Sequence, residues 1–212
     1  MNRAFTILEI VFVIVVLGIL YTIASSSLAN DRRQQAIESI YNALQQTRHM
    51  ALIDNRTNPS DPEWQQELWH IHFAQAKSRE NGAKKGYFYT VSSNLNHGAN
   101  VNKDETAIDP SNGKYYYNRN GDEKINSDES PALFLSKNFG VENIKFSGGC
   151  GPSTYIAFDH LGRPYVGGIY KAKELYSQVM LKDCYIEVEF EGDNLERAIF
   201  TIEEETGHVS VS

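Results

Sequence analysis

One carboxylate stands inside the most apolar segment of the chain. Residues 5–20 read Phe-Thr-Ile-Leu-Glu-Ile-Val-Phe-Val-Ile-Val-Val-Leu-Gly-Ile-Leu, with Glu9 near the start and Arg3 just before the run. A charged side chain in hydrocarbon costs roughly 2.5–3.5 kcal/mol on insertion scales, so an intramembrane carboxylate usually has a specific partner. The pattern predicts a membrane segment in which Glu9 has an electrostatic role.

A second group of polar side chains has the spacing of an EF-hand-type calcium loop. From Asn118 onward, oxygen-bearing side chains occupy loop positions 1, 3, 5, 9 and 12, and position 7 offers a backbone carbonyl. Calcium takes about six to eight hard oxygen ligands. The expected ligands are Asn118, Asn120, Asp122, the Lys124 carbonyl, Asn126 and Glu129. Position 6 is Glu123 instead of the usual Gly, and a solvated turn is the alternative interpretation.

The other residue types that could do chemistry give weaker patterns. Cys150 and Cys184 lie outside any Cys-x-x-Cys spacing, which argues against zinc or thioredoxin chemistry. His70 and His72 share one face of an expected strand, but the spacing supplies no third metal ligand. Neither a Gly-x-Ser-x-Gly motif nor a phosphate-binding loop is present. We expect no enzyme activity.

A single long helix is expected to carry Glu9. Beyond the apolar run, Ile37, Ile40, Tyr41 and Leu44 recur at helical spacing with polar residues on the other face. The first Pro of the chain is Pro59, so we expect a helix over residues 5–53, with about residues 5–25 spanning a membrane. The three serines at residues 25–27 are the one place where the sequence leaves undecided whether the helix is kinked.

Beyond residue 60 the hydrophobic period changes to two, which predicts strands. They are expected at residues 68–74, 86–91, 144–146, 154–158, 165–166, 184–190, 198–202 and 209–211, with a polar stretch at 92–130. The fold class is therefore α+β, with a long N-terminal transmembrane and amphipathic helix packed on a C-terminal antiparallel β-sheet domain over residues 54–212.

Composition fits a folded, exported domain. The 212 residues are 41% hydrophobic and include 12 Tyr, which argues against disorder. The formal charge of −7 argues against a nucleic-acid partner, because neutralising phosphates requires a surplus of Lys and Arg.

The N-terminal residues resemble the start of a type IV prepilin. A small residue, Phe, Thr, two aliphatics, Glu and then an apolar run with Gly18 follow that family's pattern, although Ala4 stands where the family usually has Gly. The resemblance implies a leader at residues 1–4, cleavage by a prepilin peptidase between Ala4 and Phe5, and N-methylation of Phe5. The alternative is an ordinary signal peptide cleaved near residues 24–27.

The resemblance also implies a mechanism and a place in the cell. Glu9 would pair with the amino group of Phe5 on a neighbouring subunit during assembly. The chain would cross the inner membrane once, with its N terminus in the cytoplasm and its domain in the periplasm, before entering a pilus or pseudopilus. Partners would be prepilin peptidase, other pilin or pseudopilin subunits and an inner-membrane assembly platform. In an oxidising periplasm Cys150 and Cys184 would form a disulfide, and two reduced thiols are the alternative.

Three later segments are similar to the GspH/FimT group of minor pilins and pseudopilins. They are the helix end around Arg48 and Ala51, the turn at residues 158–163, and the last strand pair at residues 200–211. The expected function is a minor pilin or pseudopilin of a type IV pilus or type II secretion system. The alternative is a pilus-tip adhesin or DNA-uptake pilin that binds a ligand through its β-domain, although the acidic residues 203–205 speak against DNA.

Overall fold

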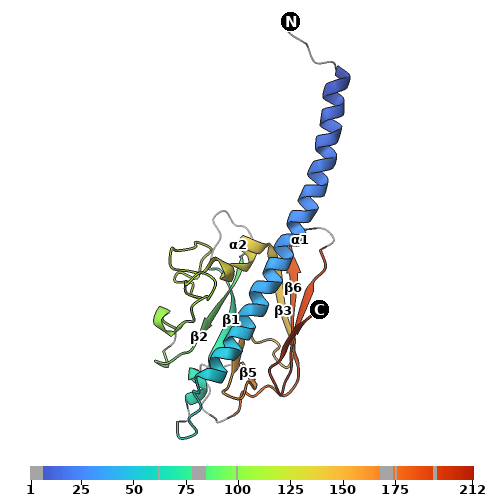
Figure 1. The fold of residues 1–212 in the computed structure, drawn as a ribbon. Helices are drawn as coiled ribbons and strands as arrows, with labels where there is room; N and C mark the ends of the chain where they lie inside the picture. The colour runs from blue at the N-terminus through green and yellow to red at the C-terminus, as the bar shows by residue number, and fades with distance from the viewer. Residues whose placement is uncertain are drawn as a thin grey trace.

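The computed structural model describes residues 7–61, 63–77, 85–98, 100–167, 174, 176–192 and 195–212, with the side chains of residues 22–28 left out. In these parts the protein is α+β: one long helix lies across two antiparallel sheets (Figure 1). The expected fold class is confirmed at this level.

Helix α1, Ile7–Ile53, has 47 residues and is continuous. At a rise of about 1.5 Å per residue it is roughly 70 Å long. The kink left open at residues 25–27 does not interrupt the helical assignment. In Figure 1 the first part of α1 extends beyond the domain, whereas its second part lies along the sheets. The helix therefore has two halves in different surroundings.

The strands form two four-stranded sheets where the sequence analysis expected one. The first sheet has the order β2-β1-β4-β5 and the second has the order β3-β6-β7-β8, with every pairing antiparallel. The strands are β1 Trp69–Gln75, β2 Tyr87–Ser92, β3 Val141–Gly148, β4 Tyr155–Phe158, β5 Pro164–Val166, β6 Cys184–Phe190, β7 Ala198–Ile202 and β8 Val209–Val211. Alternation along a strand predicts its faces but not its neighbours, which explains the missed division.

Short helices occur in the connections. They are the 3₁₀ turns η1 Trp64–Glu67, η3 Lys103–Glu105 and η4 Pro131–Leu133, and helix α2 Leu135–Phe139. Helix α2 ends at Gly140, whose φ of +70° closes it in the left-handed conformation. The chain then enters β3 directly.

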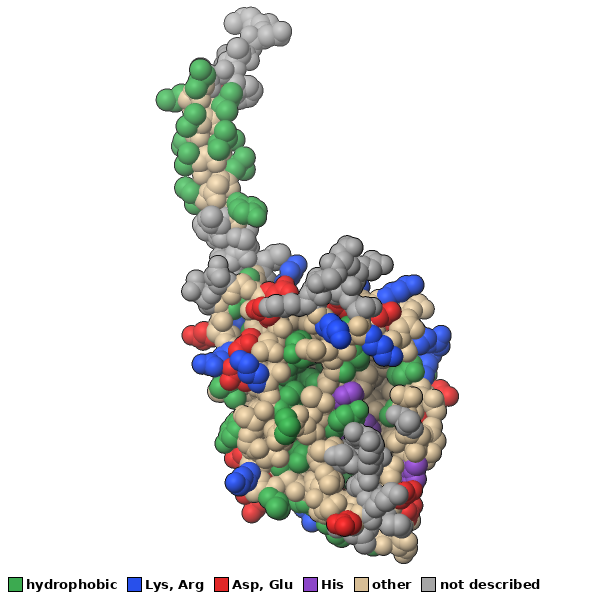
Figure 2. Space-filling view, turned by 180° about the vertical axis from the view of Figure 1, so that it is seen from behind, with side chains coloured by type: hydrophobic (Ala, Val, Ile, Leu, Met, Phe, Trp, Pro, Cys, Tyr) green, Lys and Arg blue, Asp and Glu red, His purple; other side chains and the backbone are tan. Residues whose placement is uncertain are grey.

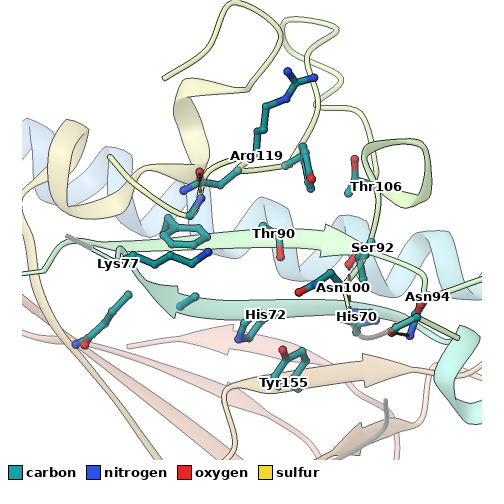
Figure 3. A pocket seen from close by; sticks show the side chains of 18 residues that line it. His70, His72, Lys77, Thr90, Ser92, Asn94, Asn100, Thr106, Arg119 and Tyr155 are labelled. Atoms are coloured by element: carbon teal, nitrogen blue, oxygen red, sulfur yellow. Dashed lines mark hydrogen bonds between the residues drawn. The ribbon is translucent and has the colours of Figure 1, made fainter. Parts of the chain in front are cut away.

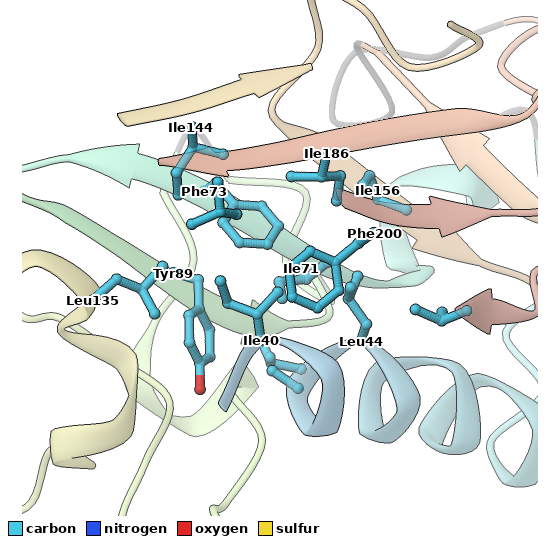
Figure 4. Close-up of a cluster of buried hydrophobic side chains, with 14 of the residues drawn as sticks. Ile40, Leu44, Ile71, Phe73, Tyr89, Leu135, Ile144, Ile156, Ile186 and Phe200 are labelled. Carbon is cyan, nitrogen blue, oxygen red and sulfur yellow. The ribbon is translucent and has the colours of Figure 1, made fainter. Parts of the chain in front are cut away.

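The core lies between the second half of α1 and both sheets. Ile40 and Leu44 of α1 are fully buried, and Figure 4 shows them facing side chains from both sheets. Those side chains are Ile71 and Phe73 of β1, Ile156 of β4, Ile186 of β6 and Phe200 of β7. Burying a side chain of this size stabilises the fold by about 1.5–3 kcal/mol. The helix stripe thus joins the two sheets into one domain.

Two turns and the helix end meet at one corner of the domain. The Arg48 guanidinium donates from Nε and Nη2 to the Thr206 carbonyl at 3.1 and 3.0 Å. A Cβ at Gly162 would lie 2.9 Å from Arg48 Nη2, and one at Gly207 would lie 2.2 Å from the Gly162 carbonyl oxygen. Both glycines also have positive φ, so the close approach and the backbone conformation both require Gly.

The expected disulfide is confirmed. Cys150 and Cys184 are bonded, with their Cα atoms 5.0 Å apart, and both are buried. The bond ties the turn after β3 to the first residue of β6.

Candidate functional site

The protruding half of α1 exposes an apolar surface on all sides. Over residues 7–21 the large hydrophobic side chains are exposed, among them Phe12 at 68% and Leu17 at 58%. Figure 2 shows hydrophobic side chains around the whole visible surface of this segment, in contrast to the mixed surface of the domain. An apolar patch of this extent marks a surface that contacts another protein or a membrane.

Glu9 lies in the first turn of this half-helix, among exposed apolar neighbours. Negative charge is favoured near a helix N terminus by the helix dipole. The expected cleavage and methylation residues, Ala4 and Phe5, lie outside the described residues.

Within the part of the chain that the structure describes, no helix is long and apolar enough to cross a membrane. The span expected over residues 5–25 lies partly outside this part, because residues 5 and 6 and the side chains of residues 22–25 are not described.

Two arginines, Arg32 and Arg33, lie where α1 enters the domain. Arg33 Nε donates to the Glu196 carbonyl at 2.7 Å, and its guanidinium lies 5.6 Å from the centre of the Phe190 ring. Arg32 beside it is exposed. A hydrogen bond and a cation–π contact thus fix α1 against the β6 and β7 end of the second sheet where the apolar half begins to leave the domain.

In the segment expected to bind calcium, the Glu129 side chain accepts hydrogen bonds from the backbone of the same segment. Glu129 is 2% exposed; its Oε1 accepts from the Arg119 N–H at 2.8 Å and its Oε2 accepts from the Asn126 N–H at 2.9 Å. The Asn126 amide donates to Oε1 as well, at 2.9 Å. Three donors on one carboxylate hold the two ends of the loop together.

Two other expected ligands, Asn118 and Asp122, also accept hydrogen bonds within the loop. Asn118 Oδ1 accepts from the Gly121 N–H and Asp122 Oδ1 accepts from the Lys124 N–H, each at 2.9 Å. Asn120 is exposed. Among the described residues no group of three or more His, Cys, Asp or Glu side chains could hold a metal ion. The geometry gives Glu129 a structural role that needs no ion, and the calcium site stays a prediction.

A cavity of about 660 Å³ opens on the face of the first sheet that points away from α1. His70 and His72 of β1 and Thr90 and Ser92 of β2 form its floor, as alternation along the strands requires. Tyr155 of β4 stacks on His72, with ring centres 3.8 Å apart and planes at 7°. Figure 3 shows these side chains pointing into the same space below the segment that carries Thr106 and Arg119.

Burial disfavours the charged form of both floor histidines. Burial lowers the pKa of His70, and its Nδ1–H donates to the Leu68 carbonyl at 3.0 Å, so Nε2 accepts from the Ser92 hydroxyl at 3.1 Å. Burial, and secondarily the nearby His70, lowers the pKa of His72 to about 4. His72 therefore offers one N–H donor and one lone pair at neutral pH.

His70 and His72 were expected on one face of a strand, whereas the cavity was not predicted from the sequence. The polar residues at alternate positions of β1 and β2 were the available signal. Lys77, Asn100 and Tyr155 join the lining from other segments, and nothing in the sequence spacing brings them together.

Comparisons of the chain with known protein families, with curated proteins and with solved structures found no match. Functional inference therefore depends on the residues and the geometry given above.

Proposed function

We propose that the protein is a minor pilin or pseudopilin, a subunit of a type IV pilus or a type II secretion system that assembles through α1. The observation that carries the proposal is the division of α1. One half packs a hydrophobic stripe into the domain, and the other half extends beyond it with apolar side chains exposed on every side. Such a half-helix requires an apolar environment from outside the chain.

Two successive states would provide an apolar environment: insertion into the membrane and then packing against other subunits. In the membrane, residues 5–25 would lie in hydrocarbon with the N terminus in the cytoplasm and the domain in the periplasm. In the fibre, the same surface would lie against the helices of other subunits. A carboxylate in this surface is costly unless it pairs with a cation, so Glu9 would favour positions next to the amino group of Phe5 on a neighbouring subunit.

The corner around Arg48 supports the assignment to the GspH/FimT group. The three segments on which that resemblance rests are far apart in sequence, yet Arg48, Gly162 and Gly207 are in contact. These contacts place the three segments of the resemblance at one corner of the domain.

The proposed partners follow from this route. Prepilin peptidase would cleave between Ala4 and Phe5 and methylate Phe5, and an inner-membrane platform would add the subunit to others of its kind. The alternative of a ligand-binding tip subunit is favoured by one observation, the polar cavity on the first sheet.

Intact-mass measurement tests the processing step. The full chain is co-expressed with a prepilin peptidase, and the membrane fraction is analysed. We expect a product that begins with N-methyl-Phe5, that Ala4→Leu abolishes and that Ala24→Leu leaves unchanged. Cleavage near residues 24–27 that Ala24→Leu blocks and Ala4→Leu tolerates would identify an ordinary signal peptide and overturn the proposal.

A further inference from the structure

The cavity on the first sheet has a floor built from strands and a wall built from the connecting segments. Its floor belongs to three neighbouring strands, β2, β1 and β4, which are held in register by backbone hydrogen bonds. At one end, the Lys77 N–H donates to the Gly121 carbonyl at 2.8 Å, which fixes the base of the Lys77 side chain against the opposite wall. A volume of about 660 Å³ is in the range of small-molecule sites.

The charge of the lining is unusual for this chain. The formal net charge is −7, from 27 acidic and 20 basic residues, yet no Asp or Glu is among the described residues that line the cavity. Lys77 has no acidic partner in the described part of the chain, and Figure 3 shows its side chain lying along the floor near Thr90. The Arg119 guanidinium points away from the floor in the same view. Among the described lining residues, Lys77 is thus the cation that faces the cavity.

Several polar groups in the cavity are available to a ligand. The ring nitrogens of His72, the Thr90 hydroxyl and the Asn100 amide have no hydrogen-bond partner among the described residues. Asn94 is 2% exposed, and its Oδ1 also has no partner within the described chain, although its Nδ2 donates to the Gly98 carbonyl at 3.1 Å. A buried acceptor without a partner is unfavourable, because it has lost its hydrogen bonds to water and gained none in the protein. A ligand hydroxyl that donates to Asn94 would remove that cost.

These features restrict the chemistry of the ligand. His70 uses both ring nitrogens within the protein, so the two histidines do not form a metal site together. The mixture of donors and acceptors suits a ligand with many hydroxyl groups, because each hydroxyl can donate and accept. The Lys77 amino group adds a preference for an anionic substituent.

We propose that this cavity binds an acidic sugar unit, with its hydroxyl groups on His72, Thr90 and Asn100 and its carboxylate or sulfate on Lys77. The proposal does not depend on fibre assembly. A ligand site on the exposed face of the domain, opposite the packed half of α1, would stay accessible in a subunit anchored by that helix.

Direct binding to the full-length protein in detergent micelles tests the proposal. The probes are a panel of uronic-acid, sialylated and sulfated oligosaccharides, their neutral counterparts, inorganic phosphate and a single-stranded oligonucleotide. We expect at least one acidic sugar to bind more tightly than its neutral counterpart and more tightly than phosphate. Binding of no acidic sugar above its neutral counterpart, or preferred binding of the oligonucleotide, would overturn the proposal.

Variants assign the binding to this cavity. Lys77→Gln should weaken binding of the acidic sugar by about tenfold or more, as expected for the loss of a hydrogen bond to a charged group. His72→Phe keeps a ring to stack on Tyr155 and removes both nitrogens, and should weaken binding of acidic and neutral sugars alike. Lys182→Gln removes an exposed lysine outside the cavity lining and is the matched control. Equal affinity of Lys77→Gln and Lys182→Gln, with unchanged melting of both, would contradict the assignment.

Discussion

The two halves of α1 belong to one helix but differ in the burial of their apolar side chains. Leu17 is 58% exposed and Leu44 is completely buried, although both are leucines on the same continuous helix. The domain half follows an amphipathic pattern, with Ile40 and Leu44 inward and Glu38 outward. The protruding half is apolar on all sides.

The two halves obtain their stability from different surroundings. A helix with an apolar stripe on one side can bury that stripe against one face of a domain. A helix that is apolar all round needs an apolar environment on every side. Changes in the domain half should therefore alter folding, and changes in the protruding half should alter insertion or assembly. The following predictions test that separation.

Loss of the disulfide should have the largest effect on the domain. Cys150 and Cys184 are separated by 34 residues, and opening such a loop costs about 3–4 kcal/mol in the chain-entropy model. Cys150→Ser with Cys184→Ser should lower the free energy of unfolding by that amount in denaturant titrations followed by Trp fluorescence. In micelles the protruding half should stay helical after the domain unfolds. Loss of all helical circular dichroism in one transition would show that the two halves of α1 unfold together.

A matched pair of leucine substitutions comes next. Leu44→Ala removes a buried side chain between the two sheets and should destabilise the domain by about 2–5 kcal/mol. Leu17→Ala should change the free energy of domain unfolding by less than about 0.5 kcal/mol, because its side chain contacts no part of the described domain. Equal destabilisation by the two substitutions would show that the halves are not independent.

Arg48 should give a smaller effect at the helix end. Arg48→Ala removes two hydrogen bonds to the Thr206 carbonyl and should cost about 1–2 kcal/mol. Arg32→Ala changes an exposed arginine on the same helix and should cost less than about 0.5 kcal/mol. Thermal melting of both variants measures the difference, and similar melting temperatures would remove Arg48 as the element that joins the two glycine turns.

The pH dependence of stability should also belong to the domain. The pKa of His72 is lowered to about 4, below its ordinary value of 6.5, so between these values the unfolded chain binds a proton that the folded chain does not. Stability should therefore decrease as the pH falls from about 6.5 towards about 4. His72→Phe should flatten this dependence in denaturant titrations at several pH values. An unchanged slope in that variant would show that other groups cause it.

Much of the fold could be predicted because local patterns specify it. The helix end at Ile53 was predicted because the first Pro of the chain, Pro59, follows shortly after it, and β6 and β7 were predicted at their observed residues because alternation is strong there. The disulfide followed from the resemblance and the compartment it implies. Sheet order was not predicted, because β1 pairs with β4 across a long intervening segment and strand alternation does not specify such neighbours.

The site was only half predictable for the same reason. Glu9 stands out because one charge interrupts an apolar run. The cavity depends on Lys77, Asn100 and Tyr155, which converge only through the tertiary fold. At residues 118–129 the sequence pattern leaves two interpretations open. The spacing of oxygen side chains is typical of calcium loops, but in the structure the Glu129 carboxylate accepts hydrogen bonds from the backbone of the same loop.

Two glutamates on α1 separate assembly through the protruding half from folding of the domain. Glu9 lies in the protruding half and Glu38 is exposed in the domain half. In cells with the complete assembly machinery, Glu9→Leu should remain membrane-inserted and cleaved but be recovered in sheared pili or pseudopili at several-fold lower levels, whereas Glu38→Leu should be incorporated normally. Incorporation of Glu9→Leu equal to that of Glu38→Leu and the unaltered protein would contradict assembly through the protruding half of the helix.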